Sequence, residues 1–444
     1  MSLPGLTTGN PKLSVSLIAE GIFLFLIIAG LLYTFFFTVI NGYLPQPYFY
    51  GSESLFTDWT VTAYFAHQPG TYSSFQSVYP PLSFVFLRYF SIKACYEYDD
   101  IFASRDCDWM VPVTLVTFFI INIYVAYKVY ANIDRRTALM RALVIGLGLP
   151  SLYALERGNL IIPCFTFFML GNSRVLRSVR LKWICSAIAI NFKPYLIMTL
   201  LAPLIKRRWR WFEGAAVTGL LVYIATFIMN GDGNPVQVVS NIMAFTTSDA
   251  HGLFNRAVYA SSYRPIVELL DSNFPLMNFL GSKPIDLMDW LLPALVTAGK
   301  VGPIVCFGAA LLKPNVIPVF RLCALAIAYV LVSQDPGGYS VVFFFFFVLM
   351  EEWRGVFTIA ALVLTYLLSI SADIKLLSIA HELVFSYLTK REVGYDLGLN
   401  LGEIIRPAMI LGVEYALIGA SFTDFFRKLE FGGTVAISPG TKLA

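Results

Sequence analysis

The chain has 444 residues, of which 57% are hydrophobic and only 14% are charged, and its mean hydropathy is +0.69. Soluble proteins carry about 25% charged residues, and a soluble core cannot hide this apolar surplus, because the surface must be compatible with water. The net charge of +4 is too small to attract phosphates generally. Composition therefore excludes a soluble enzyme, a disordered chain and a nucleic-acid-binding protein, and predicts a polytopic membrane protein.

The first apolar run, residues 15–40, exceeds the roughly 20 residues that cross a bilayer and is too long for a signal peptide. It predicts an uncleaved first span with Glu20 near its inner end. Further apolar runs cover residues 110–130, 138–155, 160–171, 183–205, 214–229, 290–312, 322–332, 341–350, 356–370 and 409–420. Prolines inside several runs, such as Pro163, Pro194 and Pro303, predict broken or kinked helices. Hydropathy thus predicts an all-α bundle of about 11–13 transmembrane helices.

Basic residues between apolar runs set the orientation, because cytoplasmic loops are enriched in Lys and Arg. Those that mark the cytoplasmic side are Lys206, Arg207, Arg208, Arg210, Arg354, Arg427 and Lys428. Three polar stretches then become outer loops, namely residues 41–109, 230–289 and 373–407. The segment 79–92 is either a short inward span or a re-entrant segment, and the basic residues that follow it favour re-entry.

The six cysteines fall into two groups. Cys164, Cys185, Cys306 and Cys323 lie in apolar runs, where they are most simply small buried hydrophobes. Cys95 and Cys107 bracket an acidic stretch of the first outer loop, where a disulfide would close a short loop in an oxidising compartment. Unpaired thiols at these two positions are the equal alternative.

Asp58 follows the first span, and apolar or aromatic residues at Val61, Tyr64 and Phe65 predict a short amphipathic helix on the membrane face. A partly desolvated carboxylate there can serve as a general base. Spacing alone favours a solvated or N-cap-like Asp instead. The later Tyr79-Pro80-Pro81-Leu82 predicts a helix start at the interface and by itself says nothing about catalysis.

Two polar features interrupt apolar runs. Glu156-Arg157-Gly158-Asn159 is an island whose charges either neutralise each other at a loop or face a wet cavity. Lys193 stands before Pro194 in the middle of an apolar stretch, where a cation costs about 3 kcal/mol on insertion scales. A helix junction that faces a pocket, with an anionic partner such as phosphate, would compensate that charge.

The second large outer loop and a later turn supply the other candidates, which suit a phosphate through Arg forks and a sugar through aromatic faces. Such residues also populate ordinary interfacial belts. The candidates are His251, Arg256, Tyr263, Arg264, Asp335 and Tyr339.

Taken in chain order, these features resemble the GT-C glycosyltransferases: the Asp after the first span, the Tyr-Pro-Pro-Leu start, the polar Gly-Asn island, Phe-Lys-Pro before a Lys/Arg/Trp cluster, and a Pro-containing late turn. Within that superfamily the chain looks most like the bacterial polyprenyl-phosphate-mannose-dependent alpha-mannosyltransferase-like branch, over roughly residues 15–350. The resemblance implies a catalytic transmembrane module at residues 1–350 and additional transmembrane helices at 351–444. It also implies that the segment 79–92 is the second span.

The resemblance further implies inverting transfer of a sugar, for which a mannose-like hexose is one candidate, from a polyprenyl-phosphate donor to a lipid-linked or glycan acceptor. The site would face the exterior of a bacterial cytoplasmic membrane, among membrane lipids. Asp58 would be the base, and Lys193, Arg256 and Arg264 would hold the donor phosphate. The substrate-binding residues would be Tyr79, Glu156, Arg157, Asn159, His251, Tyr263, Asp335 and Tyr339.

The chain also departs from the family pattern. The late turn often carries a Trp and a His in such proteins, whereas here Ser340 follows Tyr339. No Asp-x-Asp stands at Asp58, so neither a divalent metal nor another cofactor is expected. A polysaccharide polymerase or ligase with pyrophosphate-linked donors, and a membrane transporter, are the alternative functions.

Overall fold

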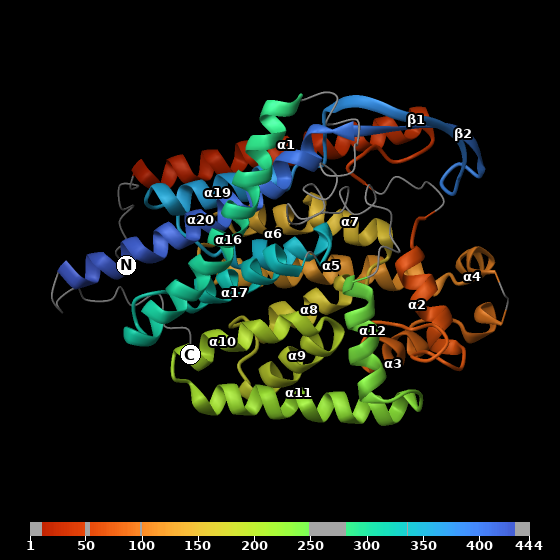
Figure 1. The fold of residues 1–444 in the computed structure, drawn as a ribbon, viewed down its shortest axis with the longest axis horizontal. Coiled ribbons are helices and arrows are strands. Elements are labelled where there is room, and N and C mark those ends of the chain that lie inside the picture. Colours follow the sequence, from red (N-terminus) through yellow and green to blue (C-terminus); the bar gives the residue numbers. More distant parts are fainter. Residues whose placement is uncertain (1–10, 49–53, 98–99, 248–280, 335, 431–444) are drawn as a thin grey trace, which may run out of the picture.

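The computed structural model describes residues 11–48, 54–97, 100–247, 281–334 and 336–430, which form a mostly helical protein (Figure 1). The helices of the first half are α1 (Pro11–Asn41), α2 (Thr57–His67), α3 (Pro81–Tyr89), α4 (Ile101–Cys107), α5 (Met110–Ala131), α6 (Ala138–Leu147), α7 (Leu149–Arg157), α8 (Ile161–Gly171), α9 (Val179–Phe192), η2 (Pro194–Leu200) and α10 (Leu201–Ile205). The second half contains α11 (Trp209–Asn230), α12 (Pro235–Thr247), α16 (Ser282–Leu312), α17 (Val319–Gln334), η3 (Gly338–Ser340), α18 (Val341–Val348), α19 (Val356–Leu368), β1 (Lys375–Ser386), β2 (Arg391–Asn400) and α20 (Leu401–Glu430).

Within the described residues, five helices are long and apolar enough to cross a membrane. Their apolar stretches are Val15–Asn41, Met110–Ala131, Trp209–Asn230, Asp286–Leu312 and Leu401–Arg427. The bent pair α6 and α7 makes a sixth if it forms one span. Five shorter apolar helices lie among them, so the predicted membrane protein is confirmed, whereas the predicted count of 11–13 spans is not.

The spans run between two ends of the molecule that differ in character (Figure 1). One end carries α2, α3, α4 and the strands, and we call it the hairpin end. The other carries the turn 206–210 between α10 and α11, and we call it the basic end. There Lys206 donates to the carbonyls of Pro314 and Ile317, which ties this turn to the one between α16 and α17.

Helix α3 corrects the span that the family resemblance implies for residues 79–92. It has nine residues and is therefore only about 14 Å long, which is less than half of a bilayer core. It packs against α2 and α11 at the hairpin end. The basic residues Arg135 and Arg136, just after α5, consequently fall toward the basic end, as the basic-residue count favoured.

Residues 375–400 are the exception to the predicted all-α fold. The strands β1 and β2 pair antiparallel, with Lys375 opposite Asn400 and Ser386 opposite Arg391. Val393 and Tyr395 of β2 pack against Tyr43, which follows α1. The strands therefore cap the end of the first span, in a stretch for which hydropathy predicted only an outer loop.

The centre of the bundle is the short helix α18, whose sequence Val-Val-Phe-Phe-Phe-Phe-Phe-Val is buried on every side. A helix that is apolar all round has no face for solvent and belongs in an interior. Phe343 and Phe346 meet Phe168 of α8 at ring distances of 4.8 and 5.7 Å in edge-on geometry. This aromatic packing fixes α18 and with it η3, which immediately precedes it.

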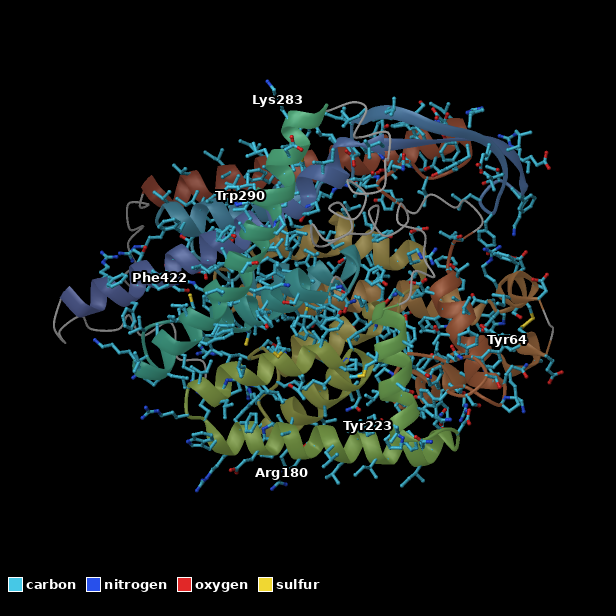
Figure 2. All side chains as sticks on the ribbon, viewed as in Figure 1. Tyr64, Arg180, Tyr223, Lys283, Trp290 and Phe422 are labelled. Carbon is cyan, nitrogen blue, oxygen red and sulfur yellow. A yellow bond between two sulfur atoms is a disulfide. The ribbon has the colours of Figure 1, made fainter. Side chains whose placement is uncertain are left out.

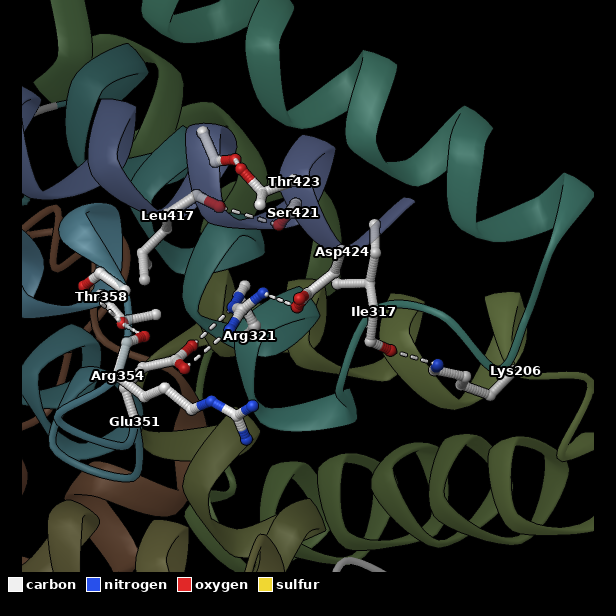
Figure 3. Close-up of polar contacts among 12 residues, drawn as sticks. Lys206, Ile317, Arg321, Glu351, Arg354, Thr358, Leu417, Ser421, Thr423 and Asp424 are labelled. Atoms are coloured by element: carbon white, nitrogen blue, oxygen red, sulfur yellow. Dashed lines mark hydrogen bonds and ion pairs between the residues drawn. The ribbon is translucent and has the colours of Figure 1, made fainter. Parts of the chain in front are cut away.

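Buried ion pairs hold the basic end together. Arg141 at the start of α6 donates to Glu20 of α1 at 2.7 and 2.9 Å. Arg321 of α17 meets both carboxylate oxygens of Glu351 at 2.5 and 2.7 Å, and its remaining terminal nitrogen reaches Asp424 of α20 at 2.6 Å (Figure 3). These contacts join helices far apart in sequence.

At the hairpin end a disulfide joins Cys95 and Cys107, whose Cα atoms are 5.5 Å apart. It is the yellow bond near the labelled Tyr64 in Figure 2. Of the two alternatives that the sequence left open, the structure contains the disulfide.

Candidate functional site

Asp58 lies in the first turn of α2, and the chain before it is held by the C-terminal end of α7. The Phe56 N–H donates to the Glu156 carbonyl at 2.9 Å, and Arg157 donates to the Ser54 carbonyl at 3.3 Å. Phe56 itself adopts a left-handed backbone conformation, with φ of 61°. These two hydrogen bonds, one from the Phe56 backbone and one from the Arg157 side chain, fix the direction in which α2 starts and therefore the position of Asp58.

The Asp58 carboxylate is clamped by the polar island. Arg157 donates to its Oδ1 at 2.6 Å and Asn159 donates to its Oδ2 at 2.7 Å. The side-chain oxygen of Asn159, Oδ1, accepts a hydrogen bond from the Ile161 N–H at 3.0 Å, which fixes the orientation of the side-chain amide. A carboxylate has about four acceptor sites, so one donor on each oxygen leaves room for a further hydroxyl. The Asp58 side chain is 18% exposed and remains accessible.

Gly158 explains how the island turns so tightly. It ends α7 in a left-handed conformation, with φ of 65°, as glycines after helices commonly do. A Cβ atom there would lie 2.9 Å from the Phe56 Cα. The missing side chain thus lets the α7–α8 turn approach the backbone that leads into Asp58.

Lys193 provides a cation beside this clamp. It follows α9 in an extended conformation, and Pro194 starts η2, so the helix breaks at this residue. Its Nζ lies 4.8 Å from the centre of the Tyr79 ring and 5.9 Å from that of Tyr339, which are cation–π distances. Asp58 is near enough to act electrostatically on both Lys193 and Tyr79. The carboxylate and the ammonium group therefore belong to one cluster.

Seven of the sequence-predicted residues lie in or beside this cluster, although they come from five separate parts of the chain. They are Asp58, Tyr79, Glu156, Arg157, Asn159, Lys193 and Tyr339. Glu156 holds the Asp58 segment through its backbone carbonyl. Its side chain is buried and interacts electrostatically with Tyr48. Five other candidates, His251, Arg256, Tyr263, Arg264 and Asp335, lie outside the described residues.

Two tyrosines of the cluster were not singled out from the sequence. The Tyr153 ring of α7 lies 5.6 Å from that of Tyr339. The Tyr195 hydroxyl donates to the Ser340 hydroxyl at 2.9 Å, which anchors η3 to η2. The only sequence signal for Tyr195 is its place directly after Lys193-Pro194, and Tyr153 has none.

The described side chains that contact the Asp58 carboxylate are nitrogen donors. Mg²⁺ and Ca²⁺ are held by several oxygen ligands, whereas both Asp58 oxygens face nitrogen donors. Among the described residues, no group of three or more His, Cys, Asp or Glu side chains could hold a metal ion. The site offers instead a carboxylate that can take a proton and cations that can hold an anion.

No family model matches the chain, and comparisons with curated proteins and with solved structures also found no match.

Proposed function

We propose that this protein is an inverting glycosyltransferase that uses a lipid-phosphate sugar as its donor. The observation that carries the proposal is one cluster that contains an accessible, oriented carboxylate, Asp58, and an ammonium group, Lys193, within electrostatic range of it. Such a pair meets the two demands of the reaction, which must remove a proton from the acceptor and hold a phosphate as it departs.

In this mechanism the acceptor hydroxyl gives its proton to a free acceptor site on the Asp58 carboxylate while its oxygen attacks the anomeric carbon. The bond between that carbon and the phosphate oxygen breaks, and the electron pair leaves with the lipid phosphate. Lys193 stabilises the charge that develops there. Arg157 and Asn159 keep the carboxylate aimed at the acceptor, and single displacement inverts the configuration at the anomeric carbon.

The aromatic rings beside Lys193 fit the same reaction. Tyr79 and Tyr339 flank the ammonium group, and both rings are half-buried. Aromatic faces suit the apolar face of a hexose, whereas the cation suits the phosphate. The donor's hydrocarbon tail would stay in the bilayer, which explains the need for an apolar, many-helix protein. From the sequence, Arg256 and Arg264 remain candidates for further phosphate contacts.

The test is transfer by purified protein from a panel of polyprenyl-phosphate sugars, with Asp58→Asn in parallel. General-base catalysis contributes about 10²- to 10⁴-fold, so the rate should fall by about that factor. Circular dichroism should show that the variant keeps its fold. The matched control is Glu97→Gln, which removes an exposed carboxyl from the same end of the molecule.

An Asp58→Asn variant that transfers sugar at the wild-type rate excludes Asp58 as the base. If the wild-type protein transfers from pyrophosphate-linked donors only, it is a polymerase or ligase instead. Broken helices such as that at Lys193 also occur in transporters. Counterflow of a labelled solute in proteoliposomes, with no covalent product, would assign the protein to that class.

A further inference from the structure

A hollow between α7, α18 and α20 adjoins the Asp58–Lys193 cluster. It is a cavity of about 50 Å³, larger than a single water molecule needs. Its wall is mostly apolar and includes Leu149 of α7, Phe345 of α18 and Ile410 of α20. One charged side chain, Arg406, completes the wall from the first turns of α20. An apolar chamber with one guanidinium suits an amphiphile with an anionic head group.

Arg406 is held in place for such a role. Its Nη2 atom lies 2.8 Å from the Asp373 carboxylate. Asp373 is itself fixed, because its other oxygen accepts the N–H groups of Ile374 and Gly402, each at 2.8 Å. A guanidinium has five N–H donors, and the ion pair engages one nitrogen. The side chain keeps 19% of its surface exposed, so it is anchored but accessible.

The cavity connects to the candidate site through two rings. Tyr153 lines the cavity, and its ring lies 5.6 Å from that of Tyr339, which in turn lies beside Lys193. A chain of contacts thus runs from Lys193 through the two tyrosines to the cavity that holds Arg406. Lys193 beside its aromatic rings and Arg406 in the wall of the cavity are thus two cations of neighbouring regions.

We propose that this cavity binds the phosphate head of a second lipid, separate from the lipid phosphate that Lys193 holds. Arg406 offers fork-like donors that match a phosphate, and the apolar wall accepts the first carbons of the chain. Arg406 lies in the second turn of α20, which directly follows β2, and its partner Asp373 lies just before β1. Its assignment to a lipid-linked acceptor rests on the proposed function; the same chemistry also fits a bilayer phospholipid.

Native mass spectrometry of the full-length protein in a neutral detergent tests the proposal. The probes are farnesyl phosphate, a short prenyl monophosphate, and dimyristoyl phosphatidylglycerol. The wild-type protein should bind two farnesyl phosphates. Arg406→Gln should weaken one of the two binding events by about tenfold to 100-fold, the effect of losing a charge-assisted contact. The matched control is Arg427→Gln, which removes an exposed arginine from the other end of the same helix and should bind both.

Two further variants guard against a simple loss of structure. Ile410→Trp fills the cavity and leaves the Arg406–Asp373 pair intact, and it should lose the same binding event as Arg406→Gln. Lys193→Gln should lose the other event and keep the one at Arg406. If Arg406→Gln and Ile410→Trp both bind two farnesyl phosphates with wild-type affinity, the cavity is not a lipid-phosphate site.

The two lipid sources give different results. Farnesyl phosphate that is not displaced by phosphatidylglycerol supports a lipid-linked acceptor, whereas preference for phosphatidylglycerol keeps the phosphate site but overturns that assignment. Because binding needs no turnover, the Arg406 site can be found in a protein that transfers no sugar, in which case only the proposed function fails. Conversely, active transfer with unchanged binding by Arg406→Gln would refute the cavity alone.

Discussion

The two ends of the molecule each contain a buried arginine–carboxylate pair, and the pairs differ in how completely they are closed. At the basic end, both oxygens of Glu351 meet Arg321, and these two side chains are only 4% and 5% exposed. At the hairpin end, Arg157 takes one oxygen of Asp58 and Asn159 takes the other, and the carboxylate stays 18% exposed. The Arg321–Glu351 pair is closed to solvent, whereas the Asp58 carboxylate of the other pair is accessible.

The side chains around the two pairs also differ. Arg321 has a second carboxylate, Asp424, as its additional partner, so the cluster adds ion pairs to the packing of α17 against α20. Asp58 has instead a lysine and two tyrosine rings nearby, which are groups that recognise ligands. The comparison teaches that Glu351 is closed off by its arginine, whereas Asp58 is an accessible carboxylate beside a cation and aromatic rings. Variants at the two ends should therefore separate stability from activity.

The largest effect on stability is expected from Arg321→Leu. It leaves Glu351 buried without its partner, and breaking a buried pair costs about 3–5 kcal/mol. Thermal unfolding in detergent should show this loss, while the transfer rate per folded molecule stays at the wild-type level. Arg354→Leu, an exposed arginine at the same end, is the control. Equal stability of the two variants would show that the Arg321 cluster does not hold the basic end.

Loss of the disulfide should cause the next largest loss of stability, and this loss should be confined to the hairpin end. Replacing Cys95 and Cys107 by Ser opens a loop of sequence separation 12, for which loop entropy predicts about 3 kcal/mol. Arg105, two residues before Cys107, donates to the Leu55 carbonyl at 3.2 Å, so the Asp58 segment should loosen as well. Hydrogen exchange should increase in residues 54–107 and stay unchanged at the basic end. The control is Cys185→Ser, which removes a free thiol.

The smallest loss of stability is expected from Gly158→Ala, about 1–2 kcal/mol for a left-handed alanine. The variant should lose more of its transfer rate than this loss of stability alone would explain, because the added methyl group displaces Phe56 and with it Asp58. Gly219→Ala, within α11 and with open space around it, should change neither quantity much. A Gly158→Ala protein that transfers sugar at the wild-type rate would show that the tight turn is dispensable for the site.

The sequence singled out polar residues that the structure brings close together, but not the contacts that join them. Asp58, Lys193 and the island at 156–159 could be singled out because polar groups beside or within apolar runs are costly and conspicuous. Their proximity could not be derived from spacing, since Asn159 and Asp58 are 101 residues apart and meet only through packing. Tyr153 gave no signal, because a tyrosine in an apolar run is ordinary.

The fold was predicted only in outline. The apolar runs fix a helical membrane protein, but α3 and the strands at 375–400 depend on tertiary contacts that hydropathy does not record. Val393 and Tyr395 of β2 are buried against Tyr43, which is some 350 residues away in the sequence. Arg321 was not recognised as a cluster centre, because its partners lie 30 and 103 residues later in the chain.

The bend between α6 and α7 has a geometric consequence for the site. The two helices meet at 40°, where Gly148 and Pro150 interrupt the helix and the Leu149 N–H finds the Ser369 carbonyl at 2.9 Å. Over the nine residues of α7, straightening that angle would swing Arg157 sideways by roughly 9 Å, given a rise of about 1.5 Å per residue. The bend at Gly148 therefore positions the Arg157 guanidinium next to the Asp58 carboxylate, and the hydrogen bond to the end of α19 supports that bend.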